Sequence, residues 1–217
     1  MVKFNKYYPD EFKKLRIAGR ISSRCLDYIK DKIKPGITTQ NINEMCVSFL
    51  QKHKAYSAPL FYRGFPKSIC TSVNHVVCHG IPSDKTLKEG DIVNVDVTTF
   101  VDGFHGDTSR TYCVGKVSVK AENLVETTRK ALERSIKILK PGIYLGDIGN
   151  EIQTYVEKKG YSVVRDFCGH GVGREFHEEP NILHYGKSGT GQKLEEGMVF
   201  TIEPMINAGK YETKVLN

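Results

Sequence analysis

Four segments of the chain carry apolar residues at helical spacing. The first begins at Pro9, repeats apolar residues every three or four positions, and ends before Pro35. The second begins near Thr39. Two further amphipathic segments follow in the second half of the chain, at roughly residues 120–139 and 147–159. Each pattern has one apolar face, and we expect each helix to bury that face against a sheet.

Short runs rich in β-branched residues lie between and after these helices. The predicted strands are residues 68–73, 91–99, 108–114, 162–165 and 198–206. The dipeptide Asp102-Gly103 lies between the second and third runs and is a strong signal for a two-residue hairpin turn. The pattern predicts an α+β fold, with an antiparallel sheet and the helices outside it.

The chain contains an internal repeat. Lys34-Pro35-Gly36-Ile37 recurs 106 residues later as Lys140-Pro141-Gly142-Ile143, each time between two predicted helices. Residues 87–96 align with residues 194–203 at an offset of 107, so Asp96 and Glu203 are equivalent acids at the ends of apolar strands. The repeat predicts two halves related by a pseudo-twofold axis, at roughly residues 10–117 and 118–217.

Composition places the chain among globular proteins. Of its 217 residues 39% are hydrophobic and 26% are charged, and it has no run of 18 apolar residues, which argues against disorder and against a membrane span. The six cysteines are scattered without a CxxC pair, and the start of the chain lacks the apolar core of a secretory signal. We therefore expect a reduced, cytoplasmic protein.

Positive charge is concentrated in the N-terminal quarter. Residues 1–54 hold 12 Lys and Arg against 5 Asp and Glu, which accounts for the whole net charge of +7. Such an excess is typical of a solvated helix face, or of a patch that meets an anionic partner such as ribosomal RNA. The charge alone does not decide between these two interpretations.

Two aspartates flank the predicted hairpin turn. If the Asp-Gly dipeptide closes the hairpin, Asp107 faces Thr98 across the pair of strands. By the same register Ser109 faces Asp96. Alternation along the strands puts both carboxylates on one face as diagonal neighbours, where they repel each other unless a proton or a cation neutralises them. The hairpin alone leaves open a cation site or two exposed acids.

A glycine-rich stretch supplies two histidines. His170 lies between Gly169 and Gly171, and His177 follows in the same stretch. Glycines permit close backbone approach, which suits a histidine held at a ligand. Carboxylates with a single imidazole donor suit Mn, Fe, Co or Zn better than a thiolate site would. Several carboxylates with few histidines also suit two ions that share a bridging water, as in metal-dependent hydrolases.

Taken together, these motifs resemble the bacterial-type (type I) methionine aminopeptidases, a family with the pita-bread fold. The resemblance rests on Asp96 and Asp107 around the hairpin turn, on the Gly-His-Gly stretch that reaches His177, and on Glu203 before Pro204. A further family motif is Val77-Cys78-His79-Gly80-Ile81-Pro82. The similarity extends from the first helix to about residue 209.

The resemblance implies a metal site with four ligands in this chain, Asp96, Asp107, His170 and Glu203. Asp107 would bridge two divalent ions, drawn from Co, Mn, Fe or Zn. The ions would lower the pKa of a bridging water, and the resulting hydroxide would attack the first peptide carbonyl. A monovalent cation would lie near Asn74 and Val76.

The resemblance also implies which residues contact the substrate. His79 and His177 would bind the substrate and stabilise the reacting carbonyl, and Glu203 would help to move protons, which makes these three the catalytic residues. The pocket for the methionine side chain would be walled by Tyr62, Phe65, Cys70 and Phe176.

One family feature has no clear counterpart. The family's fifth ligand is a second bridging glutamate, and the repeat places it at position 214, which is Lys214; the nearest acid is Glu212. We therefore expect the family's closing strand, with this glutamate, to lie beyond Asn217. Apart from that strand, we expect residues 1–217 to form a single catalytic domain.

The resemblance therefore predicts a metalloaminopeptidase that removes the N-terminal methionine of nascent proteins when the second residue is small. Its partners would be nascent polypeptide N-termini and, through the basic N-terminal quarter, the ribosome surface. We expect a cytoplasmic monomer that does not contact membranes. Two alternatives stay open: an X-Pro peptidase of the same fold, and a non-catalytic ribosome-associated binding module, which would have lost metal ligands.

Overall fold

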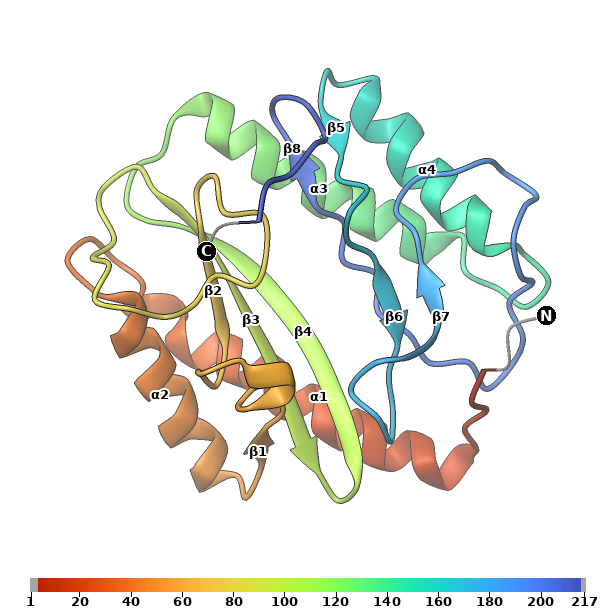
Figure 1. Cartoon of the computed structure of the whole chain (residues 1–217), viewed down its shortest axis with the longest axis horizontal. Coiled ribbons are helices and arrows are strands. Elements are labelled where there is room, and N and C mark those ends of the chain that lie inside the picture. The colour runs from red at the N-terminus through yellow and green to blue at the C-terminus, as the bar shows by residue number, and fades with distance from the viewer. Residues whose placement is uncertain (1–3, 216–217) are drawn as a thin grey trace. The chain divides into compact units, whose positions relative to one another are not determined.

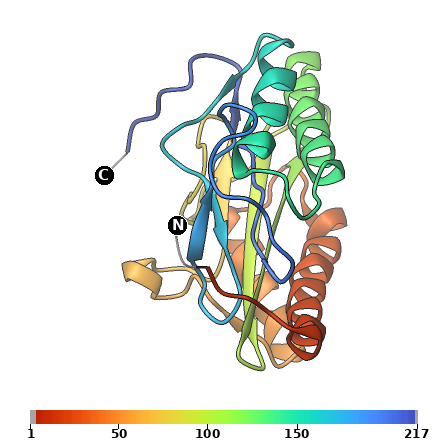
Figure 2. The ribbon, with the colours of Figure 1, turned by 90° about the vertical axis from the view of Figure 1, so that its right-hand side faces the viewer.

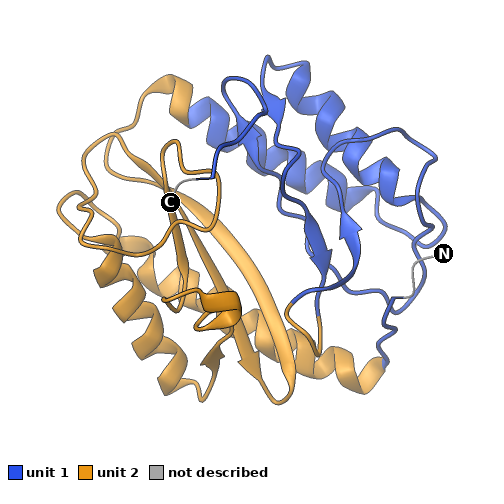
Figure 3. Ribbon diagram, viewed as in Figure 1, with its two compact units in different colours: residues 1–8, 122–172, 177–217 blue, residues 9–121, 173–176 orange. Residues whose placement is uncertain are grey.

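The chain divides into two units, each with its own helices, strands and apolar core. Figure 1 shows the computed structural model, which describes residues 4–215. Unit 1 comprises residues 1–8, 122–172 and 177–217, and unit 2 comprises residues 9–121 and 173–176 (Figure 3). The short segment 173–176 of unit 2 is therefore flanked on both sides of the sequence by unit 1.

Unit 2 combines two long helices with an antiparallel sheet. Its elements are α1 (Pro9–Ile29), η1 (Lys30–Lys32), α2 (Thr39–Lys52), β1 (Tyr56–Ser57), η2 (Tyr62–Gly64), β2 (Cys70–Val73), β3 (Ile92–Val101) and β4 (Phe104–Cys113). The strands β1, β2 and β4 all pair antiparallel with β3. Figure 2 shows α1 on one side of the β3–β4 hairpin and the 3₁₀ turn η2 on the other.

The β3–β4 hairpin has the predicted register. Thr98 faces Asp107, and Asp96 faces Ser109. Asp102 and Gly103 form the turn with φ values of +50° and +82°, the left-handed pair that a type I′ turn requires. The predicted strands, 91–99 and 108–114, stop short of the turn. In the structure β3 continues to Val101 and β4 starts at Phe104, because strand pairing extends up to the turn residues.

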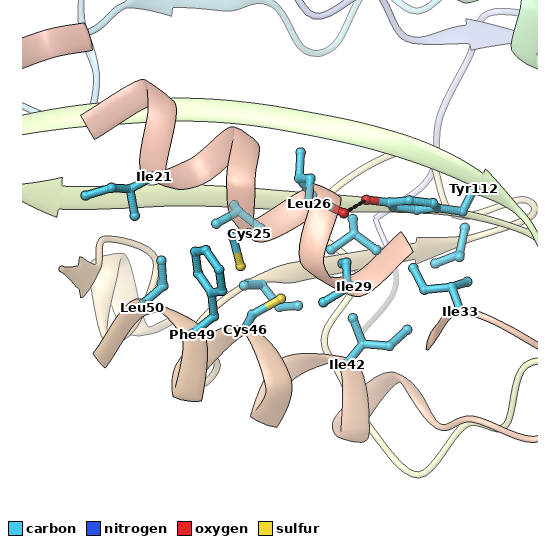
Figure 4. Packing of buried hydrophobic residues seen from close by; sticks show 14 of the residues in the cluster. Ile21, Cys25, Leu26, Ile29, Ile33, Ile42, Cys46, Phe49, Leu50 and Tyr112 are labelled. Carbon is cyan, nitrogen blue, oxygen red and sulfur yellow. Dashed lines mark hydrogen bonds between the residues drawn. The ribbon is translucent and has the colours of Figure 1, made fainter. Parts of the chain in front are cut away.

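The core of unit 2 lies between its helices and its sheet (Figure 4). It is formed by one face of α1, one face of α2 and alternate residues of β3, among them Leu26, Ile29, Ile42, Phe49, Val93, Val95 and Val97. The hydroxyl of Tyr112 on β4 donates a hydrogen bond of 2.7 Å to the carbonyl of Leu26 on α1. Each such aliphatic side chain contributes about 1.5–3 kcal/mol by burial, so this layer fixes α1 on the sheet.

Unit 1 contains the second pair of helices and two short strand pairs. Its elements are α3 (Val119–Lys137, whose first turn belongs to unit 2), α4 (Leu145–Glu157), β5 (Ser162–Val163) paired with β8 (Ile206–Asn207), and β6 (Gly169–Gly171) paired with β7 (Glu178–Ile182). Its core is formed by Ala131, Ile148, Ile152, Val156, Val163, Ile182 and Leu194.

One predicted strand, residues 198–206, is wrong as a continuous element. Regular pairing occurs only at Ile206–Asn207, with an isolated bridge between Phe200 and Gly171. The reason lies at Glu203 and Pro204, because neither residue has a backbone N–H available for a hydrogen bond to a neighbouring strand. The N–H of Glu203 donates to the side chain of His184, and proline has no N–H.

The internal repeat reappears as the same hydrogen bonds within each unit. In unit 2, Gly36 N–H donates to the carbonyl of Leu87 over 2.9 Å, and Leu87 N–H donates to the carbonyl of Ile37 over 2.8 Å. In unit 1, Gly142, Leu194 and Ile143 make the equivalent bonds over 2.9 and 2.7 Å. The glycines of the two copies, Gly36 and Gly142, both have a φ of +96°.

Two further expectations concern the extent of the chain. The organisation of residues 1–217 as one catalytic domain stays a prediction, and the expected closing strand lies outside the described residues. No helix in the described part of the chain is both long and apolar enough to cross a membrane.

Candidate metal and substrate site

The two predicted acid ligands of unit 2 lie on one face of its sheet. Asp96 is in the central strand β3, between Cys70 on β2 and Ser109 on β4. Its sequence neighbours Val95 and Val97 are fully buried in the core beneath the helices. Because side chains alternate along a strand, Asp96 points away from that core, and so does its diagonal neighbour Asp107.

The backbone beside Asp107 is held tightly by α1. A Cβ atom on Gly106 would lie 2.2 Å from the carbonyl carbon of Ala18 and from the nitrogen of Gly19. The hydroxyl of Ser22 donates to the carbonyl of Gly106 over 2.6 Å. Only glycine allows this approach, which fixes the strand that presents Asp107.

Cys70 lies close to both acids and remains a neutral thiol. Burial raises the pKa of Cys70 most, and the nearby Asp96 carboxylate raises it further, as do Cys78 and Asp107. A thiol in this environment does not ionise near neutral pH, so it offers an apolar wall rather than a thiolate ligand. This agrees with a substrate-binding role for Cys70.

His79 is presented by a strained loop beside β2. Its φ of +55° is left-handed, and its side chain is exposed. The following residue, Gly80, accepts a hydrogen bond of 2.7 Å from the N–H of Thr71. A Cβ on Gly80 would lie 2.2 Å from the carbonyl oxygen of Thr71. The glycine thus anchors the loop to β2, the strand that neighbours Asp96.

Three of the predicted pocket residues gather around η2. The rings of Tyr62 and Phe176 have centroids 4.9 Å apart. Phe65 closes the 3₁₀ turn by donating its N–H to the carbonyl of Tyr62 over 2.9 Å. The ring of Phe176 also stacks on that of His105, with centroids 5.8 Å apart. His105 was not identified from the sequence, where a lone histidine after the Asp-Gly turn gives no signal.

Unit 1 brings its three predicted site residues together. The Nε2 atom of His170 lies 3.5 Å from the Oε1 atom of Glu203, and the rings of His170 and His177 have centroids 4.2 Å apart. The hydroxyl of Thr201 donates to Oε1 of Glu203 over 2.6 Å and accepts the N–H of His170 over 3.0 Å. Glu203 and His170 are therefore oriented by the same threonine.

A backbone hydrogen bond of His170 fixes which of its ring nitrogens carries the proton. Its Nδ1 atom lies 2.8 Å from the carbonyl of Gly171, which can only accept, so Nδ1 carries the proton. The Nε2 atom then carries the lone pair, and it lies 3.5 Å from Oε1 of Glu203. Histidines that bind metals characteristically donate their other ring N–H to a carbonyl or carboxylate in this way. The flanking glycines allow it, because a Cβ on Gly169 would lie 2.5 Å from the carbonyl of Thr201.

His184 is a second residue that the sequence analysis missed. It is fully buried, and its Nε2 atom accepts the N–H of Glu203 over 3.1 Å. Burial lowers the pKa of His184 to about 4, so the ring is neutral at pH 7. Its sequence context, Ile182-Leu183-His184-Tyr185, predicts only a buried segment.

The donor set fits divalent metal ions. Of the predicted ligands, Asp96 and Asp107 lie in unit 2, and His170 and Glu203 lie in unit 1. Carboxylates and imidazole are donor types that suit borderline divalent ions. Within residues 4–215 no three His, Cys, Asp or Glu side chains are placed to hold an ion by themselves.

A profile of metallopeptidase family M24 matches residues 13–215. The chain belongs to metallopeptidase family M24. The methionine aminopeptidase of Rickettsia prowazekii (strain Madrid E) is 57% identical over 203 residues, which are 94% of this chain and 78% of that protein. The methionine aminopeptidase of Escherichia coli (strain K12) is 50% identical over 210 residues, which are 96% of this chain and 80% of that protein.

Solved structures agree with this membership of family M24. The crystal structure of the methionine aminopeptidase from Rickettsia prowazekii matches with a TM-score of 0.96 at 55% identity, over 98% of this chain and 86% of that chain. An X-Pro aminopeptidase from Thermotoga maritima matches less well, with a TM-score of 0.77 at 25% identity, over 92% of this chain and 54% of that chain. The predicted pita-bread fold is confirmed, and as an M24 metallopeptidase the protein acts with divalent metal ions.

Proposed function

We propose that this protein removes the N-terminal methionine from polypeptides whose second residue is small. The observation that carries the proposal is the similarity of at least 94% of the chain to methionine aminopeptidases at 50–57% identity. The X-Pro alternative has weaker support, since the X-Pro aminopeptidase structure is 25% identical. A binding module without catalysis is not favoured, because four ligand candidates and both histidines are present.

Four residues would hold the metal ions, namely Asp96, Asp107, His170 and Glu203. The support within unit 1 is the Nε2 atom of His170, which lies 3.5 Å from Oε1 of Glu203 while Nδ1 donates to Gly171. In unit 2 the support is the pair of acids on one face of the sheet. Bound divalent ions would supply Lewis acidity and lower the pKa of a water molecule. We propose two such ions, drawn from Co, Mn, Fe or Zn, and a monovalent cation near Asn74 and Val76.

The other residues of the proposed site would bind and orient the peptide. His79 and His177 would donate hydrogen bonds to the reacting carbonyl oxygen, which gains negative charge in the transition state. Glu203 would accept and return a proton, because its carboxylate is already oriented by Thr201. Tyr62, Phe65, Cys70 and Phe176 would surround the methionine side chain with an apolar, neutral wall.

The experiment compares a free-amine peptide with an acetylated peptide and with Xaa-Pro peptides. The metal-loaded protein is incubated with Met-Ala-Ser, with N-acetyl-Met-Ala-Ser, and with Leu-Pro-Ser and Phe-Pro-Ser, and the products are identified by mass spectrometry. Loss of one methionine from the free-amine peptide, with the acetylated peptide intact, supports the proposal. Preferential cleavage of peptides with Leu or Phe before proline would instead identify an X-Pro peptidase.

We also propose a cytoplasmic monomer that contacts the ribosome through its basic N-terminal quarter. The support is the concentration of the net charge of +7 in residues 1–54. Exposed basic residues in that region include Lys30 and Lys34 near the end of α1. Reversing both charges should weaken cosedimentation with ribosomes and leave peptide cleavage unchanged. Equal cosedimentation of the variant and the parent would reject this contact.

A further inference from the structure

Contacts at Gly173, Arg174 and Phe176 hold the segment Gly173–Phe176 against the rest of unit 2. The carbonyl of Gly173 accepts two hydrogen bonds from His105, one from the backbone N–H over 2.7 Å and one from the ring Nδ1 over 3.0 Å. Arg174 pairs with Glu11 of α1. The ring of Phe176 lies against Tyr62. The residues on both sides of the segment in the sequence belong to unit 1.

His105 makes two of its contacts with this segment through its ring. The carbonyl of Gly173 can only accept, so Nδ1 of His105 carries the proton in that bond. The ring also stacks on Phe176, with an angle of 10° between the ring planes, and its centroid lies 4.8 Å from that of Phe100. One imidazole therefore fixes both the first and the last residue of the segment.

The segment needs such a constraint because of its sequence. It begins with Gly173 and follows closely on Gly169 and Gly171, and glycines give the backbone more accessible conformations than other residues do. Without outside contacts, the position of the Phe176 ring would be poorly defined. The contacts of the Phe176 ring with Tyr62 and with His105 supply that definition.

We propose that His105 is a positioning residue for methionine selectivity: it holds Phe176 against Tyr62 and so sets the width of the wall that meets the substrate's first side chain. The inference rests on the proposed function, since it assigns that wall to the methionine pocket. His105 acts through Phe176 and does not take part in the chemical step. Its loss should therefore affect KM and selectivity more than kcat.

The test uses the full chain with Met-Ala-Ser and Leu-Ala-Ser as substrates. For His105→Ala we expect KM for Met-Ala-Ser to rise about fivefold to tenfold and kcat to stay within about twofold. The preference for methionine over leucine should fall about tenfold. These changes correspond to the loss of roughly one aromatic contact. His105→Asn keeps a donor for the Gly173 carbonyl but lacks the ring, so it should restore part of the KM.

His53 provides a matched control in the same unit. Its Nδ1 atom lies 2.8 Å from the carbonyl of Phe49, and its ring stacks on Phe49 with centroids 4.1 Å apart. It makes the same two kinds of contact as His105, but at the end of α2 and with Phe49, a core residue that is not among the proposed pocket residues. His53→Ala should lower the thermal midpoint and leave both KM and the methionine preference unchanged.

A double-mutant cycle with Phe176→Leu separates positioning from general stability. If His105 acts through Phe176, His105→Ala should change KM less than twofold in the Phe176→Leu background. Additive effects, or a His105→Ala variant that loses only thermal stability as His53→Ala does, would overturn the inference. Should His105→Ala not fold, the same cycle with His105→Asn gives the answer. Absence of methionine release by the unmodified protein would instead overturn the proposed function.

Discussion

Glycines next to the predicted ligands let two backbones meet at distances that any side chain would prevent. Gly106 precedes Asp107, and Gly169 precedes His170; in each case the missing Cβ leaves room for a neighbouring main chain. Successive residues of a strand face opposite sides, so the side chain after each glycine faces away from that close contact. This alternation explains why each glycine is the direct sequence neighbour of a predicted ligand.

Replacing Gly106 should be far more harmful than replacing a glycine with open space beside it. We expect Gly106→Ala to lower the free energy of unfolding by about 3 kcal/mol, because the methyl group would overlap the backbone of α1. Gly19→Ala is the matched control: nothing lies within 4 Å of its Cβ position, and alanine favours the helix by up to about 1 kcal/mol. Urea unfolding of both variants measures the two effects, and equal losses would contradict the packing described for α1.

The two histidines of unit 1 should have separable roles. His170→Ala should weaken metal binding, because it removes the only nitrogen donor of the proposed ligand set. His177→Ala should lower kcat and leave the metal content unchanged, because it removes only a contact with the substrate. Metal analysis of the purified variants, together with their kinetics, checks this, and the reverse pattern would show that the two roles have been exchanged.

At the scale of elements, the sequence predicted those whose signals are local. The Asp-Gly turn fixed the hairpin register, and α1 to α4 begin and end within a few residues of their patterns. The strand predicted at 198–206 is interrupted because the N–H of Glu203 donates to the side chain of His184 and Pro204 has no N–H. His105 was missed because its partner Gly173 lies 68 residues away.

The two repeat-related caps of α2 and α4 give a pH-dependent prediction. Asn41 accepts the N–H of Thr38, and its equivalent Asp147 accepts the N–H groups of Tyr144 and Gly189 and the hydroxyl of Ser188. The bonds from Ser188, Tyr144 and Gly189 hold the pKa of Asp147 below its usual range. A lowered pKa stabilises the fold above the ordinary pKa of aspartate, and that contribution is lost as the pH falls through the folded value.

Asp147→Ala should therefore lower the free energy of unfolding by about 1 kcal/mol at pH 7 and by less below about pH 4. Asn41→Ala removes a cap that does not titrate, so its effect should be the same at both pH values. Urea titrations at pH 7 and pH 3.5 give the comparison. A loss for Asp147→Ala that does not change with pH would contradict the role of its charge.

At the scale of the whole molecule, the repeat explains why each unit holds a predicted ligand at the same position of its sequence. Asp96 and Glu203 stand at equivalent positions, and each unit repeats the same glycine turn and the same helix-start bonds. The sequence could predict this organisation because both copies keep recognisable motifs. It could not predict His105 or His184, because neither histidine aligns with a histidine in the other copy of the repeat.

Metal-dependent release of methionine, measured with two hairpin variants side by side, tests the central claim most directly. The chelated protein, Asp107→Asn and Asp102→Asn are each supplied with a divalent metal and Met-Gly-Met, and free methionine is quantified by mass spectrometry. Asp102 lies in the turn with a φ of +50°, a conformation that asparagine tolerates, so its variant is the control. We predict release only with metal, nearly normal activity for Asp102→Asn, and a loss of at least about 100-fold for Asp107→Asn. Release that survives exhaustive chelation, or equal losses in the two variants, would contradict the account.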